Sequence, residues 1–275
     1  MNFAQPTAMM QRYLLDNVLL NKVHHIEALD LLALLPDASV DAIITDLPYG
    51  TTQSHFDVVI PFAPMWAGVR RVLKPRGVFV TTASQPFTSA LVMSNPSWFR
   101  YEWIWVKSQA TGFLDANRRP LKAHENIIVF AETAPPYYPQ MTKGKPYKVQ
   151  AKGCKTNYGK HERIATVNDG DRYPRTDLYF DPEVGLHATQ KPVALYRYLV
   201  RTYTQPGEIV LDFYSGSGTT GEAARAEGRQ FILGEKEAEY VAVTRDRLRM
   251  PFERRHVPMN ARVDDLPLFA AVGGD

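Results

Sequence analysis

Four consecutive residues, Asp46-Leu47-Pro48-Tyr49, combine groups that could bind a flat, amino-bearing ring. They follow the apolar run at positions 42–45, which predicts a buried strand that ends abruptly at proline and glycine. The carboxylate and a backbone carbonyl can accept the two hydrogens of an amine while the aromatic ring stacks on the heterocycle. An acid-x-Pro-Tyr turn also arises by chance in many enzymes, so other segments must support this interpretation.

A second polar turn follows the strand predicted at 208–212. Its candidate ligand-binding residues are Asp212, Tyr214, Gly216, Ser217, Gly218, Thr219 and Thr220. Glycines after a strand let the backbone approach a ligand, and free N–H groups and hydroxyls at the next helix start can hold a phosphate or a carboxylate. The turn lacks the Lys-Ser/Thr ending of a triphosphate loop and the full dinucleotide fingerprint, which counts against ATP and NAD.

Two acids stand at the ends of further predicted strands. Glu235 follows the strand at 231–234, a position that normally holds the two hydroxyls of a ribose. Glu27 follows the strand at 22–26 and either contacts a ligand or only places negative charge at a helix N-terminus. The glycine turn, the helix start and Glu235 together predict a nucleoside cofactor with no phosphate requirement.

Alternating strands and helices must position these residues. The strands are predicted at 22–26, 42–45, 78–82, 102–107, 126–131, 208–212 and 231–234, and the helices at 8–20, 28–35, 64–73, 195–204, 221–227 and 238–250. Strand, helix, strand with a Pro-Gly stop is the repeating unit of a doubly wound sheet. The series predicts an α/β fold whose sheet is mostly parallel with an antiparallel edge.

The composition changes between 133 and 186, where Pro, Tyr, Lys, Gly and Asn replace the apolar runs. We therefore place an inserted domain there, between a first half at 1–132 and a second half at 187–250, with a tail at 251–275. Positions 143–163 hold seven basic residues against one acid. Basic side chains with interleaved tyrosines suit a nucleic-acid surface, although a solvated basic loop has the same composition.

The candidate DNA-binding residues lie in this insertion and in the basic loop at 117–122. They are Arg118, Arg119, Lys122, Lys143, Lys145, Tyr147, Lys148, Lys152, Lys155, Tyr158, Lys160 and Arg163.

Length and composition limit the classes of protein to which the chain can belong. The 275 residues, 45% of them hydrophobic, can bury one large core with an insertion, and the net charge of +3 argues neither for nor against nucleic acid. The single cysteine, Cys154, excludes an internal disulfide, and the histidines lack ligand spacing, so we expect no metal. No stretch approaches the roughly 20 apolar residues of a membrane span, and no signal core is present, so we expect a cytoplasmic, nucleoid-associated protein without membrane contact.

The order of these motifs resembles the β class of DNA amino-methyltransferases, which use S-adenosylmethionine. Positions 46–49 are similar to their Asp-Pro-Pro-Tyr signature, with leucine for the first proline, and 211–220 to their cofactor motif. Positions 187–192 are similar to their His-Pro-Thr-Gln-Lys-Pro segment. The resemblance covers roughly positions 23–248, and 118–130, 144–147 and 172–176 further resemble phage and prophage members.

The resemblance implies a circularly permuted, Rossmann-like fold with a seven-stranded, mostly parallel sheet, helices on both faces and an inserted target recognition region. It implies that Glu27 contacts the cofactor's adenine, that Glu235 holds its ribose, and that Asp212 is the acid ending the first cofactor strand. The segments around the methionine carboxylate are Thr189, Gln190, Lys191, Pro192, Thr219 and Thr220. It further implies double-stranded DNA as substrate and a homodimer.

The implied reaction is methyl transfer to an exocyclic amine after the base leaves the DNA stack. Asp46 and the Leu47 carbonyl would accept the amine hydrogens, and Tyr49 would stack on the ring. Aspartate at position 46 is more similar to the adenine-N6 enzymes than to the cytosine-N4 enzymes, which commonly carry serine. The alternatives are a cytosine-N4 or RNA methyltransferase, a protein-glutamine methyltransferase, and a DNA-binding regulator with a vestigial site.

Overall fold

The computed structural model describes residues 8–52, 54, 57–149, 154–156, 159–161, 165–183 and 190–250, with only the backbone at 8, 11, 154–156 and 159–161. The chain divides into two units. The larger comprises Met1–Tyr138 and Thr176–Asp275, and the smaller is Pro139–Arg175. The smaller unit falls within the segment 133–186 that the composition assigns to an insertion.

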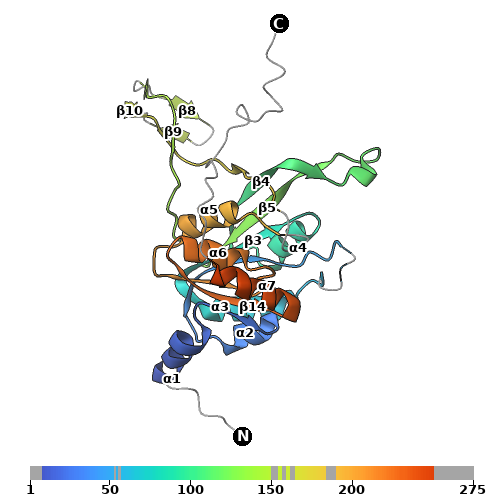
Figure 1. Ribbon diagram of the computed structural model, residues 1–275. Coiled ribbons are helices and arrows are strands. Elements are labelled where there is room, and N and C mark those ends of the chain that lie inside the picture. Colours follow the sequence, from blue (N-terminus) through green and yellow to red (C-terminus); the bar gives the residue numbers. More distant parts are fainter. Residues whose placement is uncertain are drawn as a thin grey trace. The chain divides into compact units, whose positions relative to one another are not determined.

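An eight-stranded sheet in the order β1-β14-β13-β2-β3-β5-β4-β12 is the framework of the larger unit (Figure 1). Its strands are β1 (Lys22–His25), β2 (Val40–Asp46), β3 (Leu73–Ala83), β4 (Phe99–Thr111), β5 (Lys122–Phe130), β12 (Asp177–Tyr179), β13 (Ile209–Asp212) and β14 (Gln230–Glu235). Only β5 runs against its neighbours, β3 and β4. The prediction of a doubly wound, mostly parallel sheet is therefore confirmed.

The eighth strand, β12, is the difference from the seven strands that were expected. It pairs parallel to β4, with Asp177 opposite Ile104, and adds one short strand to the edge of the sheet. Three residues are too few to show a period of two, so the sequence pattern around Leu178 gave no signal of a strand.

Helices cover both faces of the sheet because its strands are apolar on both sides, as expected for parallel strands. The helices are α1 (Ala8–Tyr13), η1 (Leu14–Leu19), α2 (Ala28–Leu34), α3 (Phe62–Val72), α4 (Phe87–Ser94), η2 (Phe113–Asp115), α5 (Val193–Tyr203), α6 (Thr219–Ala226) and α7 (Ala238–Arg249). Helices α2, α3 and α4 bury their apolar residues in one core cluster, and α5, α6 and α7 in the other. The sequence pattern did not predict α4. None of the described helices has the length and apolar character of a bilayer-spanning segment.

The central strands β2 and β13 pair in parallel, with Ala42 opposite Val210. The buried carboxylate of Asp212 stabilises the pairing of these two strands. It accepts hydrogen bonds from the hydroxyls of Thr45 (2.7 Å) and Thr220 (2.5 Å). The backbone N–H of Tyr214 donates a third, at 3.0 Å. Burial outweighs these bonds and raises the pKa of Asp212 to about 6. One side chain thus ties β2, β13 and the start of α6 together.

Strands β4 and β5 continue past the sheet as a hairpin arm, seen in green in Figure 1. The turn at its end carries the short helix η2, and Phe113 and Leu114 expose 75% and 83% of their surface there. Large apolar side chains so exposed at a protruding tip indicate a contact surface.

The smaller unit consists of three two-stranded ladders in the part that is described. They pair β6 (Thr142–Lys143) with β11 (Asp171–Arg172), β7 (Tyr147–Val149) with β10 (Thr166–Asn168), and β8 (Cys154–Thr156) with β9 (Gly159–His161). The Arg172 guanidinium lies over the Tyr147 ring at 4.7 Å. A cation on an aromatic face stabilises this small unit, which has little core.

The raised pKa of Asp212 predicts how stability depends on pH. The unfolded carboxyl ionises near 3.8 and the folded one near 6, so its contribution to stability is full below pH 3.8 and is lost as the pH rises to about 6. A shift of this size corresponds to about 3 kcal/mol. We expect Asp212→Asn to remove this loss, measured as the difference in unfolding free energy between pH 4 and pH 7 for the two proteins. An unchanged pH dependence in the variant would contradict the assignment.

Candidate active site

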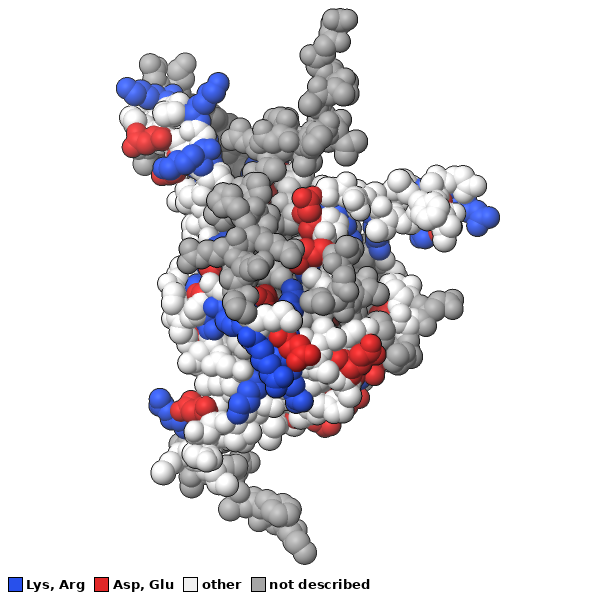
Figure 2. Space-filling model, in the orientation of Figure 1, with Lys and Arg blue, Asp and Glu red and all other residues white. Residues whose placement is uncertain are grey.

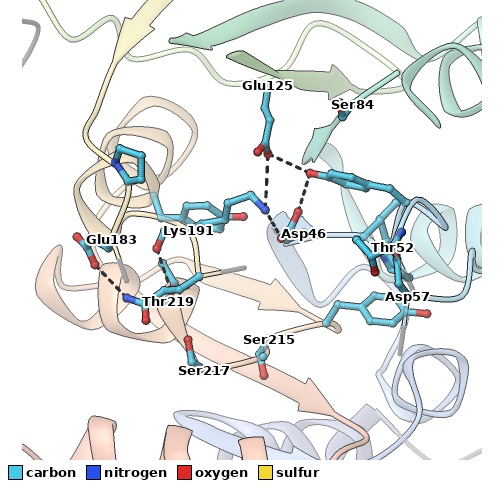
Figure 3. A pocket seen from close by; sticks show the side chains of 18 of the residues that line it. Asp46, Thr52, Asp57, Ser84, Glu125, Glu183, Lys191, Ser215, Ser217 and Thr219 are labelled. Carbon is cyan, nitrogen blue, oxygen red and sulfur yellow. Dashed lines mark hydrogen bonds and ion pairs between the residues drawn. The ribbon is translucent and has the colours of Figure 1, made fainter. Parts of the chain in front are cut away.

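A cleft of about 540 Å³ opens at the carboxyl edge of the sheet (Figure 3). The loop that follows β2 lines it, with Asp46 and Tyr49, and so does the turn that follows β13, with Gly216 and Ser217. Glu235 at the end of β14 also lines it. The two motifs that are distant in the sequence therefore share one cavity, as open α/β sheets place their ligands.

Asp46 is the last residue of β2, and its carboxylate accepts three side-chain hydrogen bonds. The Tyr49 hydroxyl donates to Oδ1 at 2.9 Å, and the Thr82 hydroxyl, on the neighbouring strand β3, donates to the same oxygen. The Lys191 ammonium binds Oδ2 at 2.5 Å. Both oxygens of the carboxylate are thus occupied by the protein's own donors.

The Tyr49 ring lies against Phe87 of α4, with centroids 5.3 Å apart and planes 25° apart. Its hydroxyl is also 3.3 Å from Oε2 of Glu125. Burial, followed by the charges of Asp46 and Glu125, raises the pKa of Tyr49 well above its usual value. Tyr49 therefore remains a neutral hydrogen-bond donor and an aromatic surface on the cleft.

Glu125 brings a second carboxylate to the cleft. It lies on β5 opposite Trp105, and its Oε1 accepts a hydrogen bond from Lys107 while its Oε2 is 3.6 Å from the Lys191 ammonium. Burial raises the pKa of Glu125, but Lys191 and Lys107 outweigh burial and hold the pKa below its usual value. Two carboxylates and two ammonium groups thus form one nearly buried cluster.

Leu47 and the loop after it shape one wall of the cleft. The Leu47 side chain is buried in the core, which accounts for an apolar residue other than proline at this position. Asp57 accepts hydrogen bonds from the backbone N–H groups of Gly50, Thr51 and Thr52 at 2.8, 2.9 and 2.6 Å. Partial burial raises the pKa of Asp57, but the Thr52 hydroxyl and these backbone bonds outweigh burial and lower the pKa below its usual value. Pro48 lines the cleft beside them.

The glycine turn brings backbone close to the cavity. Gly218 has φ +81°, and a Cβ there would lie 2.6 Å from the Thr244 side chain, so only glycine fits. Gly216 has φ +48° and donates its N–H to Oε2 of Glu235 at 2.9 Å. The Ser215 hydroxyl is buried and has no protein partner. An unpaired buried hydroxyl beside a helix N-terminus is suited to a polar ligand.

The two acids of the predicted nucleoside site differ in position. Glu235 is buried, which raises its pKa, and it accepts from the N–H of Glu237 at 2.8 Å as well as from Gly216. Glu27 is exposed and is not among the cleft-lining residues, but its charge acts on Tyr214. Burial, Glu27 and Glu235 together raise the pKa of Tyr214 to about 12.

Gln190 and Lys191, shortly before α5, line the cleft. Gln190 donates to Glu183 at 3.1 Å, and the Thr219 hydroxyl donates to the Lys191 carbonyl at 3.3 Å. The Lys191 ammonium, which the resemblance places near a cofactor carboxylate, is bound to Asp46. Pro192 is the residue before α5 and is not a cleft-lining residue, and Thr189 lies outside the described residues.

The predicted DNA-binding residues fall on two parts of the chain. Arg118 and Arg119 are exposed at the end of the β4–β5 arm, where Arg119 pairs with Asp115, and Lys122 begins β5 and lines the cleft. Of the predicted residues in the smaller unit, four are exposed: Lys143, Lys145, Tyr147 and Lys148. Lys155 and Lys160 lie on β8 and β9, and Lys152, Tyr158 and Arg163 lie outside the described residues.

Sequence reasoning missed Glu125, Lys107 and Thr82. Glu125 was missed because β5 is antiparallel and brings its first residues to the edge where the parallel strands end. Thr82 and Lys107 lie within predicted strands, and the sequence does not show that they bind Asp46 and Glu125. The available signal was an acid two residues before the apolar run at 127–130. Within the described part of the chain, no group of three or more His, Cys, Asp or Glu side chains is placed to hold a metal.

Comparisons with known proteins agree with this architecture. A family model described as DNA methylase, for N6 and N4 methyltransferases, matches residues 40–246. The type II methyltransferase M.BglII from Bacillus subtilis is 27% identical over 250 residues, which is 82% of this chain and 68% of that protein.

Solved structures show the same fold. The M1.HpyAVI–SAM complex has a TM-score of 0.57 and 25% identity, covering 82% of this chain and 98% of that one. The PvuII DNA methyltransferase, which is cytosine-N4-specific, has a TM-score of 0.60 and 19% identity, covering 85% of this chain and 87% of that one. With the family model spanning both motif regions and the intervening insertion, this chain belongs to the DNA methylase family of N6 and N4 amino-methyltransferases.

Proposed function

We propose that this protein transfers a methyl group from S-adenosylmethionine to the N6 amine of adenine in duplex DNA. The observation that carries the proposal is the shared cleft, in which Asp46 and Tyr49 face the same cavity as Gly216 and Ser217. Direct transfer requires the donor methyl and the acceptor amine to meet in one site, since proximity and orientation supply much of the rate.

The glycine-turn end of the cleft fits the methyl donor. When bound, S-adenosylmethionine supplies a methyl group made electrophilic by its sulfonium. The unpaired Ser215 hydroxyl, the turn at Gly216 and the start of α6 suit the polar parts of the cofactor. Glu235 and Tyr214 would hold the nucleoside part, because both line this end and Glu235 ends the second strand of the cofactor unit.

The other end of the cleft fits a base that has left the stack. Extrusion costs a few kcal/mol, and stacking on one aromatic ring returns about 1–3 kcal/mol. Tyr49 offers that ring, with its far side supported by the buried Phe87. Asp46 and the Leu47 carbonyl would accept the two amine hydrogens, which leaves the nitrogen lone pair directed at the methyl group.

The choice of adenine rests on Asp46, because serine is common at this position in the cytosine-N4 enzymes that the chain resembles. Cytosine N4 is the second candidate, favoured by the similarity of the fold to the cytosine-N4-specific PvuII enzyme. Both reactions methylate an exocyclic amine in the same way, so only identification of the methylated nucleoside distinguishes adenine from cytosine as the target.

DNA would contact both the β4–β5 arm and the smaller unit. Figure 2 shows Lys and Arg side chains (blue) at the end of the arm. Arg118 and Lys122 suit phosphate contacts, and the exposed Phe113 and Leu114 suit an apolar contact near the target site. We assign sequence readout to the smaller unit, in which Lys145, Tyr147 and Lys148 are exposed and the Arg172 guanidinium lies over the Tyr147 ring.

The first prediction concerns the product. Incubation with unmethylated DNA and S-adenosylmethionine should give N6-methyladenine, because position 46 carries aspartate and not the serine common in the cytosine-N4 enzymes. Enzymatic digestion followed by mass spectrometry of the nucleosides measures it, with RNA as the parallel substrate. N4-methylcytosine as the only product would select the second candidate, and no methylated nucleoside in DNA would refute the proposed reaction.

The second prediction concerns Asp46. Asp46→Ala removes the acceptor that orients the amine, and we expect the rate of methyl transfer to fall by at least about a hundredfold, the scale of a lost preorganised electrostatic contact. Cofactor affinity, measured by calorimetry, should change little because the cofactor lies at the other end of the cleft. Asp30→Ala, at an exposed acid on α2, is the control. Near-normal turnover of Asp46→Ala would remove Asp46 from the mechanism.

The third prediction concerns the hairpin arm. Arg118→Ala should weaken DNA binding and lower the slope of log affinity against log salt by about one, as expected for the loss of one phosphate contact. Titration of labelled duplex at several salt concentrations measures this slope. Arg12→Ala, at an exposed arginine of α1, is the matched control and should leave the slope unchanged. Equal slopes for both variants and the wild type would exclude the arm from the phosphate contacts.

A further inference from the structure

The Lys191 ammonium occupies the position that the target amine needs. Its Nζ is 2.5 Å from Oδ2 of Asp46 and 5.6 Å from the centroid of the Tyr49 ring, over which it lies. Figure 3 shows Asp46, Glu125 and Lys191 converging on one point of the cleft. An N–H donor on this carboxylate, over this ring, is the arrangement proposed for the amine of the extruded base.

The amine cannot enter while Lys191 keeps this position. Oδ1 of Asp46 already accepts hydrogen bonds from Tyr49 and Thr82, so the incoming amine would have to bind Oδ2. A hydrogen bond from an ammonium to a carboxylate is roughly twice as strong as one between neutral groups. A neutral amine therefore displaces Lys191 only if a second anion holds the ammonium once it leaves Asp46.

Glu125 is that anion. Its Oε2 is 3.6 Å from the Lys191 Nζ, within the range of an ion pair, while its Oε1 is bound by Lys107. The side chains of Lys191 and Glu125 are only 9% and 12% exposed, so water gives the ammonium little compensation. Moving from Asp46 to Glu125 keeps it paired, and the cluster of two carboxylates and two ammonium groups stays electrically balanced.

We propose that Lys191 is a placeholder for the target amine, and that Glu125 is the positioning residue that draws Lys191 off Asp46 when the base enters. This inference rests on the proposed transfer to an exocyclic amine. It assigns Lys191 to the base end of the cleft and gives Glu125, which no sequence motif indicated, a part in admitting the substrate.

Two variants separate this role from a merely structural one. In Glu125→Gln the ammonium loses its second anion and stays on Asp46, so the single-turnover rate at saturating DNA should fall roughly tenfold, the difference between a charged and a neutral hydrogen bond. Adding Lys191→Met removes the ammonium that blocks Asp46, so Glu125 is no longer needed to draw it away. The double variant loses one positive and one negative charge, so the remaining cluster stays electrically balanced. We expect the double variant to recover to within about threefold of the wild type, a change smaller than one hydrogen bond.

Wild-type methyl transfer to DNA is measured first, so that failure of the proposed function is distinguished from failure of this inference. Glu102→Gln, at a β4 carboxylate bound by Asn126 outside the cleft, is the control and should retain the wild-type rate. Cofactor binding by calorimetry and the melting temperature show whether each variant folds. If the variant with Glu125→Gln and Lys191→Met does not fold, the variant with Glu125→Gln and Lys191→Gln takes its place. A double variant as slow as Glu125→Gln, or a Glu125→Gln rate equal to the wild type, would overturn the inference.

Discussion

The parallel pairing of β2 with β13 is the constraint on which the site depends. It places Asp46 and the glycine turn, which are far apart in the sequence, at the ends of adjacent strands. The pairing is reinforced inside the protein by Asp212, which binds Thr45 of one strand and Thr220 beyond the other. A buried carboxylate is costly unless its oxygens are satisfied, so these hydrogen bonds both stabilise the junction and fix its geometry. Because the two strands end side by side at this junction, the turns that follow them line one cleft.

Charge balance is the second physical principle of the site. Asp46, Glu125, Lys107 and Lys191 are all largely buried, and an unpaired charge among them would be strongly destabilising. A cluster with equal numbers of both signs can exchange partners without creating an uncompensated charge. In the proposed mechanism the cluster stays balanced with and without a neutral base in the cleft, and Asp46 lies beside the nitrogen on which positive charge develops.

Much of this was predictable because strand ends carry their own signals. The apolar runs before Asp46, Asp212 and Glu235 end in polar or glycine-rich turns, and parallel strands must bring such ends to one edge. Glu125 was not predictable in this way, because the direction of β5 is set by pairing and not by its own residues. The partner of Lys191 was missed for a related reason, since a motif gives the position of a long side chain in the sequence but not the anion it reaches.

The central claim is that one cleft holds the methyl donor and an extruded base side by side. A crystal structure of the protein with methylatable duplex DNA and the demethylated cofactor tests it most directly. We expect a base out of the helix, stacked on Tyr49 with its amine on Asp46, and the cofactor at Gly216 and Ser217 with its sulfur facing that amine. A target base still stacked in the duplex, or a cofactor bound away from the glycine turn, would contradict it.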